Sequence, residues 1–126
     1  MARRFRLEGL ERARRAVARI PETMRLARTE TLNTWAEEVQ AGAKDKAPRA
    51  SGALHGDLNT KVAEQWGRAE VGVWDQPAVE YALYVEKGTS KMAAQPYLVP
   101  AFNEARPLVT RTYRAAFRRH LGGVTE

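Results

Sequence analysis

The sequence predicts an α+β fold in a single domain over residues 1–126, with a long N-terminal helix and a kinked C-terminal helix packed on a small, mainly antiparallel sheet. Apolar residues recur at steps of three and four near both ends of the chain, which is the period of one helix face. Two short segments in the middle alternate apolar and polar side chains, as strands do. A chain of 126 residues is long enough to bury one hydrophobic core.

The N-terminal apolar pattern predicts two helices. Its members are Leu10, Ala13, Val17, Ile20, Met24, Ala27, Thr31, Trp35 and Val39. Pro21 divides the pattern because proline has no N–H to donate and disfavours helical geometry in the residue before it. We therefore expect a short helix over residues 9–19 and a long helix over residues 21–46, with Trp35 buried on its apolar face. Residues 3–7 alternate and predict a short extended segment.

A β-hairpin is expected in the middle of the chain. Residues 47–52 contain proline and glycine and predict a turn after the long helix. Alternation then predicts strands over residues 58–64 and 69–73. Gly67 lies between them and supplies the conformational freedom that a tight connection needs. The two strands should therefore pair in an antiparallel sheet.

Two further helices complete the predicted fold. Residues 79–86 form a short helix, and Gly88 ends it. One face of this helix is expected to carry Val79 and Leu83, with Tyr84 beside them. A loop over residues 87–95 leads to a helix that begins after Pro96 and runs to about Leu121, before two glycines. Pro107 should kink or split this last helix.

Positive charge is concentrated near the two ends of the chain. The net charge is +6, with nine arginines against four acids in residues 1–34 and five arginines against two acids in residues 104–126. Two helix faces should carry the basic surface, formed by Arg12, Arg15 and Arg19 and by Arg111, Arg114 and Arg118. Such faces suit nucleic acid or an acidic neighbouring subunit. The alternative is that these arginines only solvate the outer faces of two helices.

The residues offer no pattern typical of an enzyme. The chain lacks cysteine and has two histidines, His55 and His120, which we expect at the surface. The acids Asp75, Glu80 and Glu86 are scattered, so a metal-dependent nuclease has little support. We expect no enzymatic activity, no cofactor and no metal. No apolar run approaches the roughly 20 residues of a membrane span, and the N-terminus lacks the apolar block of a secretory signal.

The loop between the last two predicted helices is a candidate subunit interface. Its residues are Lys87, Gly88, Thr89, Ser90, Lys91, Met92 and Tyr97. Tyr84 and Tyr97 should fix the two ends of the loop. Met92 either enters a pocket on a partner or folds back onto the core. The two lysines could pair with acids such as Glu70 or Asp75 on a neighbour.

Three motifs in this order resemble the bacteriophage neck and minor tail-component family, often described as gene product ten-like. They are Ala47-Pro48-x-x-Ser51-Gly52-x-Leu54, Tyr81-Ala82-x-Tyr84-Val85-Glu86-x-Gly88-Thr89 and Gln95-Pro96-Tyr97-Leu98-x-Pro100-Ala101. The resemblance covers about residues 5–117. The chain departs from the family at His55-Gly56-Asp57, where a basic residue and a serine are usual.

The resemblance implies a structural, non-enzymatic virion protein of the neck or tail end of long-tailed phages. Such a protein joins head to tail or completes the tail as a subunit of a six-fold or twelve-fold ring. Its implied partners are other copies of itself and head-closure, connector or tail-tube proteins. Genomic DNA would pass through the channel without sequence-specific contacts. The implied location is the virion, after assembly in the host cytoplasm. The alternative is a small, basic, non-specific DNA-binding protein that uses the same arginines.

Overall fold

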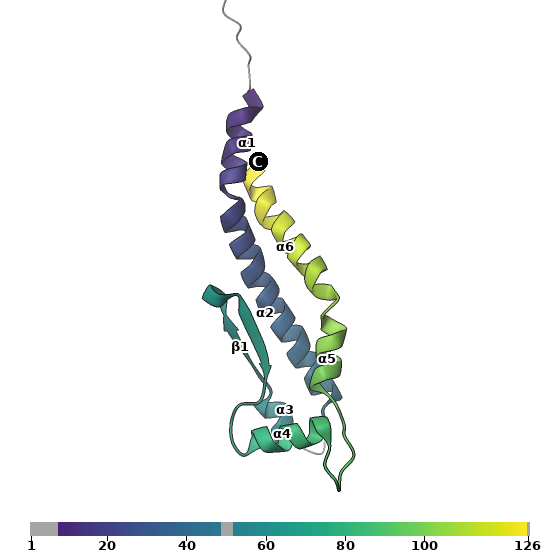
Figure 1. Cartoon of the computed structure of the whole chain (residues 1–126). Helices are drawn as coiled ribbons and strands as arrows, with labels where there is room; N and C mark the ends of the chain where they lie inside the picture. The colour runs from purple at the N-terminus through teal and green to yellow at the C-terminus, as the bar shows by residue number, and fades with distance from the viewer. Residues whose placement is uncertain (1–7, 49–51, 126) are drawn as a thin grey trace, which may run out of the picture.

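The computed structural model describes residues 8–48 and 52–125 and confirms the α+β class. In chain order the elements are α1 (Glu8–Ala18), α2 (Ile20–Lys46), α3 (Gly52–Asp57), β1 (Asn59–Ala63), the short 3-10 helix η1 (Glu64–Trp66), β2 (Arg68–Gly72), α4 (Ala78–Lys87), α5 (Leu98–Ala105) and α6 (Leu108–Thr125). Figure 1 shows an elongated molecule in which α1 and α2 run one way and α5 and α6 return beside them. The β-hairpin lies along α2, and α3 and α4 close the end opposite the C-terminus.

Both expected breaks at proline are confirmed. Pro21 lies in the first turn of α2, and Pro107 lies in the turn between α5 and α6. The predicted end of the last helix at Leu121 is wrong, because α6 continues through Gly122 and Gly123. The end of α6 packs against α1. This packing compensates for the roughly 1 kcal/mol by which each glycine disfavours a helix.

Small side chains allow α2 to lie close to α5 and α6. The buried residues of α2 are Thr23, Ala27, Thr31, Ala36, Val39 and Ala43. Facing them, Ala101 and Ala105 of α5 and Ala116 of α6 are buried. A Cβ on Gly42 would lie 3.3 Å from the Cβ of Ala101, so the helices touch at this point. Eight of the thirteen buried apolar residues in the described part of the chain are alanines.

The larger core side chains gather where α3 and α4 meet α2. Leu54 and Leu58 are fully buried there and pack with Val85 and Tyr97. The turn predicted over residues 47–52 ends in α3, a helix that the sequence pattern did not indicate. This short helix brings Leu54 under the end of the hairpin.

The apolar face predicted for α4 from Val79, Leu83 and Tyr84 does not turn inward as a whole, since only Val79 of the three is half-buried. Leu83 and Tyr84 are 51% and 45% exposed, while Ala82 and Val85 are buried instead. The small side chain of Ala82 lets α4 lie close to Tyr97, whose hydroxyl reaches the Ala82 carbonyl oxygen. Close packing of Ala82 on Tyr97 therefore decides which face of α4 turns inward.

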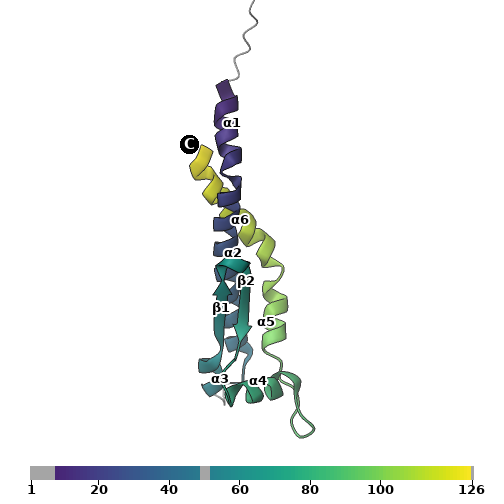
Figure 2. The same ribbon diagram turned by 60° about the vertical axis from the view of Figure 1, so that its left-hand side comes forward.

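The β-hairpin confirms the predicted strand pair and is fastened to α2 at both of its ends. Gln40 Nε2 donates to the carbonyl oxygen of Leu58, 2.8 Å away, just before β1. Arg28 donates to the carbonyl oxygen of Glu64, 2.9 Å away, at the tip. Gly67 takes the left-handed conformation, with a φ of 62°. Figure 2 shows the β-hairpin lying in front of α2, with α5 alongside α2.

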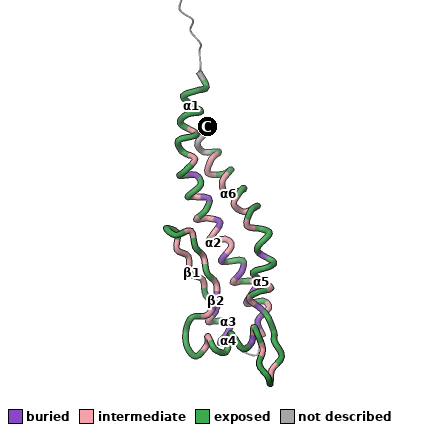
Figure 3. The backbone as a smooth tube through the Cα atoms, viewed as in Figure 1, coloured by how far each residue is buried: buried purple, intermediate pink, exposed green. Residues whose placement is uncertain are grey.

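Several apolar residues of α1 and of the first turns of α2 are exposed to solvent. Leu10, Val17 and Met24 belong to the apolar pattern, but all three are exposed. Leu10 and Val17 lie on α1, which extends beyond the part of α2 that other elements cover, and Met24 lies in the second turn of α2 near that end. Figure 3 shows the largely exposed tube of α1. Trp35 is half-buried rather than buried, with its ring edge-on to Phe102 at a centroid distance of 5.7 Å. The extended segment expected over residues 3–7 lies outside the described residues.

Candidate functional site: a loop, a groove and a cationic end

The loop between α4 and α5 is fastened at its base by backbone and carboxylate contacts. Glu86 accepts hydrogen bonds from the N–H groups of Tyr97 and Leu98, at 3.2 and 2.7 Å. This carboxylate therefore satisfies free donors at the start of α5 and places negative charge at the helix N-terminus. Gln95 donates to the Val85 carbonyl oxygen at 2.8 Å, which closes the loop.

Tyr97 belongs to the interior of the subunit, so its prediction as an interface residue is wrong. The side chain is 2% exposed, and its hydroxyl donates to the carbonyl oxygen of Ala82 at 3.1 Å. Burial, together with the nearby charge of Glu86, raises the pKa of Tyr97 to about 12. Tyr97 does fix one end of the loop as expected, whereas Tyr84 at the other end points into solvent.

The rest of the loop offers polar rather than apolar contacts. Lys87, Thr89, Ser90 and Lys91 are exposed, and Gly88 is half-buried. Met92 packs against the subunit's own core, so the alternative in which it folds back is the arrangement observed. Contact between this loop and a neighbouring subunit, through the two lysines, stays a prediction.

Stability at high pH should depend on Tyr97. Because the folded pKa is about 12 and the ordinary value is 10.0, folding favours the protonated phenol. Its contribution is complete below pH 10 and is lost as pH rises toward 12. Tyr97→Phe should flatten this fall in the free energy of unfolding, measured by denaturant titration across that range. An equal fall in the variant would place the titrating group elsewhere.

An open groove, which the sequence reasoning missed, runs between β2 and α5 over α2. Its wider part, about 470 Å³, is lined by Thr31, Leu32, Trp35, Trp66, Gly67, Arg68, Ala69, Phe102, Arg106 and Val109. Trp35 and Phe102 also line a narrower part of about 240 Å³, with Val39, Val71, Leu98 and Val99. We call both parts together the apolar groove. The one sequence signal for it was Trp66, a tryptophan beside a turn glycine, which is 75% exposed.

The predicted basic residues lie toward one end of the molecule. Arg12, Arg15, Arg19, Arg111, Arg114 and Arg118 are all exposed, and none forms an ion pair with an acid in residues 8–48 or 52–125. The helices that carry the two clusters, α1 and α6, contact each other. Arg119 differs, since it donates to both oxygens of Glu30, at 2.6 and 2.9 Å. This contact holds the pKa of Glu30 below its ordinary value.

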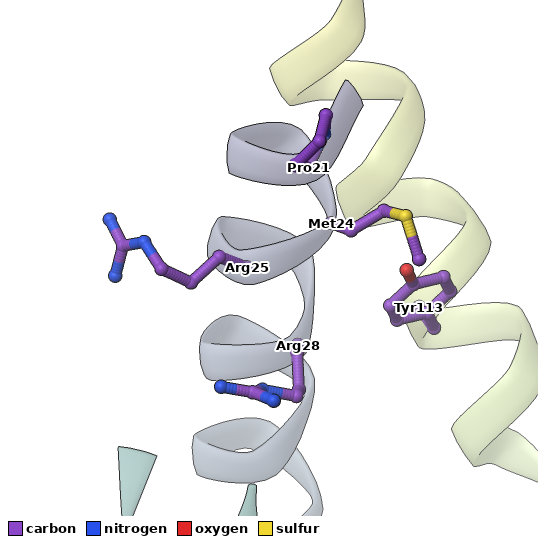
Figure 4. A pocket seen from close by; sticks show the side chains of 5 residues that line it. All are labelled: Pro21, Met24, Arg25, Arg28 and Tyr113. Atoms are coloured by element: carbon purple, nitrogen blue, oxygen red, sulfur yellow. The ribbon is translucent and has the colours of Figure 1, made fainter. Parts of the chain in front are cut away.

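A shallow pocket of about 360 Å³ lies between α2 and α6 near this cationic end (Figure 4). Met24 and Tyr113 face each other across it, while Arg25 points away. Arg25 pairs with Glu22 at 2.6 Å, and Arg28 binds the hairpin tip. Both arginines are thus already engaged, so the pocket is poorly suited to binding an anion.

Among the side chains that the structure describes, Asp75, Glu80, Glu86 and His120 are not gathered into a metal-binding group. Among the residues that it describes, no group of three or more His, Cys, Asp or Glu side chains could hold a metal ion. Glu86 is occupied by the backbone of α5, and His120 lies 3.6 Å from Glu30. Within the described ranges, no helix is both long and apolar enough to cross a membrane.

Searches for similar proteins add no family to this description. Models of known protein families, curated proteins and solved structures gave no match to this chain.

Proposed function

We propose that this protein is a structural subunit of a phage neck or tail end, where copies form a ring that joins head to tail or completes the tail. One observation carries the proposal. In the described residues, eleven large apolar side chains are exposed, while only Val39, Leu54, Leu58, Val85 and Tyr97 are buried among residues of that size. Extensive apolar exposure around a small core is typical of chains that bury surface against partners.

The roles of the motif residues support the same proposal. Gly88 and Tyr97 belong to the motifs that resemble the neck and tail family, as does Glu86. All three hold the α4–α5 connection in place through backbone conformation, burial or hydrogen bonds. These three residues therefore stabilise the fold of the subunit. This role agrees with the structural, non-enzymatic function that the resemblance implies.

The proposal is tested by the composition of purified phage particles. A ring subunit should be present at a fixed six or twelve copies per particle, because ring symmetry sets the number. Quantitative mass spectrometry measures this copy number directly.

Non-specific DNA binding is a second candidate function, favoured by two clusters of exposed arginines carried by helices that contact each other. Exposed arginines without acidic partners are free to neutralise phosphates. Binding of this kind would weaken steeply as the salt concentration rises. The logarithm of the binding constant should fall with the logarithm of the salt concentration, with a slope of about −0.9 for each phosphate contact. A duplex affinity that scarcely changes with salt, or no affinity, would remove this candidate.

A further inference from the structure

The outward face of α4 is a short apolar stripe between two opposite charges. The stripe residues follow at helical steps of three and four and are all exposed: Glu80, Leu83, Tyr84 and Lys87. The opposite face of α4 holds it to its own subunit through Ala82 and Val85, both buried. The stripe therefore points away from the core and cannot fold onto the groove of the same chain.

The apolar groove has the complementary character. Its floor and walls are aromatic and aliphatic, with Trp35 and Phe102 in both of its parts. Of the described residues that line it, the charged ones are Arg68 and Arg106, and none is an acid. Groove and stripe thus match in polarity, and the arginines can receive the acid at the start of the stripe.

The two surfaces also match in length. At 1.5 Å per residue, the α5 wall of the groove from Leu98 to Arg106 is about 12 Å long. On the same basis, the stripe from Glu80 to Lys87 is about 10 Å long. Leu83 and Tyr84 then fall at the middle of the groove when Glu80 lies at its arginine end.

We propose that the α4 stripe of one copy lies in the apolar groove of a second copy, with Leu83 and Tyr84 against Trp35 and Phe102. This is helix-in-groove recognition, in which residues at helical spacing enter an apolar cleft. Glu80 faces Arg68 in this arrangement. The inference rests on the proposed function, since it identifies the contact between neighbouring ring subunits.

A second copy is the occupant that satisfies both surfaces at once. The contact joins two different surfaces, so each added copy offers a free stripe and a free groove. Head-to-tail contacts of this type close into rings when the rotation between copies allows it. The residues that meet are the aromatic and arginine types that are enriched at protein interfaces.

Cross-linking of single-cysteine variants tests the contact, because the natural chain has no cysteine. Tyr84→Cys and Phe102→Cys are purified separately, checked by circular dichroism, mixed and treated with a short thiol-reactive linker. We expect a covalent dimer from the mixture and only background from either variant alone. Arg12→Cys, on α1 at the far end, is the matched control and should give background with both partners.

Two results would overturn the contact. The first is a mixture of the folded variants that gives no dimer at about 1 mM of each, where even a contact with a Kd of about 1 mM is roughly 40% formed. The second is a dimer formed equally well by either variant alone, because that requires the same surface on both copies.

Charge exchange tests the orientation of the stripe. Added to the Tyr84→Cys partner, Glu80→Arg should lower the dimer yield about tenfold, because it places like charges together. Replacing Arg68 and Arg106 by Glu in the other partner should restore the yield. Glu37→Arg, at an exposed position outside the groove, should leave the yield unchanged. An undiminished yield with Glu80→Arg would reject the proposed orientation.

The cross-linking experiment and the copy number in particles test the self-contact and the proposed function separately. A correct copy number in particles without the cross-link would mean that the ring forms through other surfaces. A cross-link in a protein that is absent from particles would keep the self-contact and discard the virion role.

Discussion

Gly88→Ala should lower the free energy of unfolding by about 2–5 kcal/mol, since a left-handed backbone costs other residues about 1–2 kcal/mol and overpacking adds about 1–3 kcal/mol. The φ of Gly88 is 77°. An added Cβ would lie 2.7 Å from the backbone nitrogen of Ala94 and 2.9 Å from the carbonyl oxygen of Met92. Backbone atoms cannot move aside as a flexible side chain would, so the α4–α5 connection must distort. Urea unfolding followed by circular dichroism measures the loss.

Gly122→Ala is the matched control for Gly88→Ala. A Cβ on Gly122 meets nothing within 4 Å, and the residue lies within α6. Alanine is the better helix former, so this variant should keep its stability or gain up to about 1 kcal/mol. A Gly88→Ala protein as stable as the wild type would mean that the loop is not held as described.

Leu58→Ala should cost about 2–5 kcal/mol, because it leaves a cavity in the largest part of the core. Leu58 is fully buried, and its carbonyl oxygen also receives Gln40, so its position is tightly fixed. The same urea experiment, at low protein concentration, measures the change.

Leu83→Ala makes the same chemical change on the exposed face of α4. Because Leu83 is 51% exposed, its replacement should alter the stability of the isolated subunit by no more than about 0.5 kcal/mol. If Leu83→Ala were as costly as Leu58→Ala, the outward orientation of α4 would be wrong.

The sequence was informative wherever one residue determines the local backbone. Pro21 and Pro107 mark helix boundaries because they lack a donor, and Gly67 and Gly88 mark the two turns with positive φ. Apolar alternation likewise located both strands of the hairpin to within one or two residues. These features gave the α+β class, because they depend on near neighbours in the chain.

The sequence was misleading about which apolar faces are covered. A helical period identifies the apolar side of a helix, but coverage depends on how far other elements reach. Met24 lies near the N-terminal end of α2, where few other elements cover the helix. Leu83 lies on the outward face of α4, whereas Ala82 packs closely on Tyr97. Alanine adds little to an apolar pattern, yet here it marks the places where helices touch.

The candidate site was predictable only in part, for the same reason. The basic faces could be read from helical spacing, and their residues are exposed as expected. The groove could not be predicted from the sequence, because Trp35, Trp66 and Phe102 lie on three elements that are distant in the chain. Tyr97 was assigned to an interface because nothing local showed that the Ala82 carbonyl oxygen would accept its hydroxyl in the core.

The number of copies per particle tests the proposed structural role most directly. Purified particles are analysed by quantitative mass spectrometry against a capsid protein of known copy number. The account predicts six or twelve copies per particle, unchanged after salt washing, because a ring is part of the assembled particle. A chain that is absent from particles, or whose amount falls steadily as salt removes it, would contradict the account and favour an accessory DNA-binding protein.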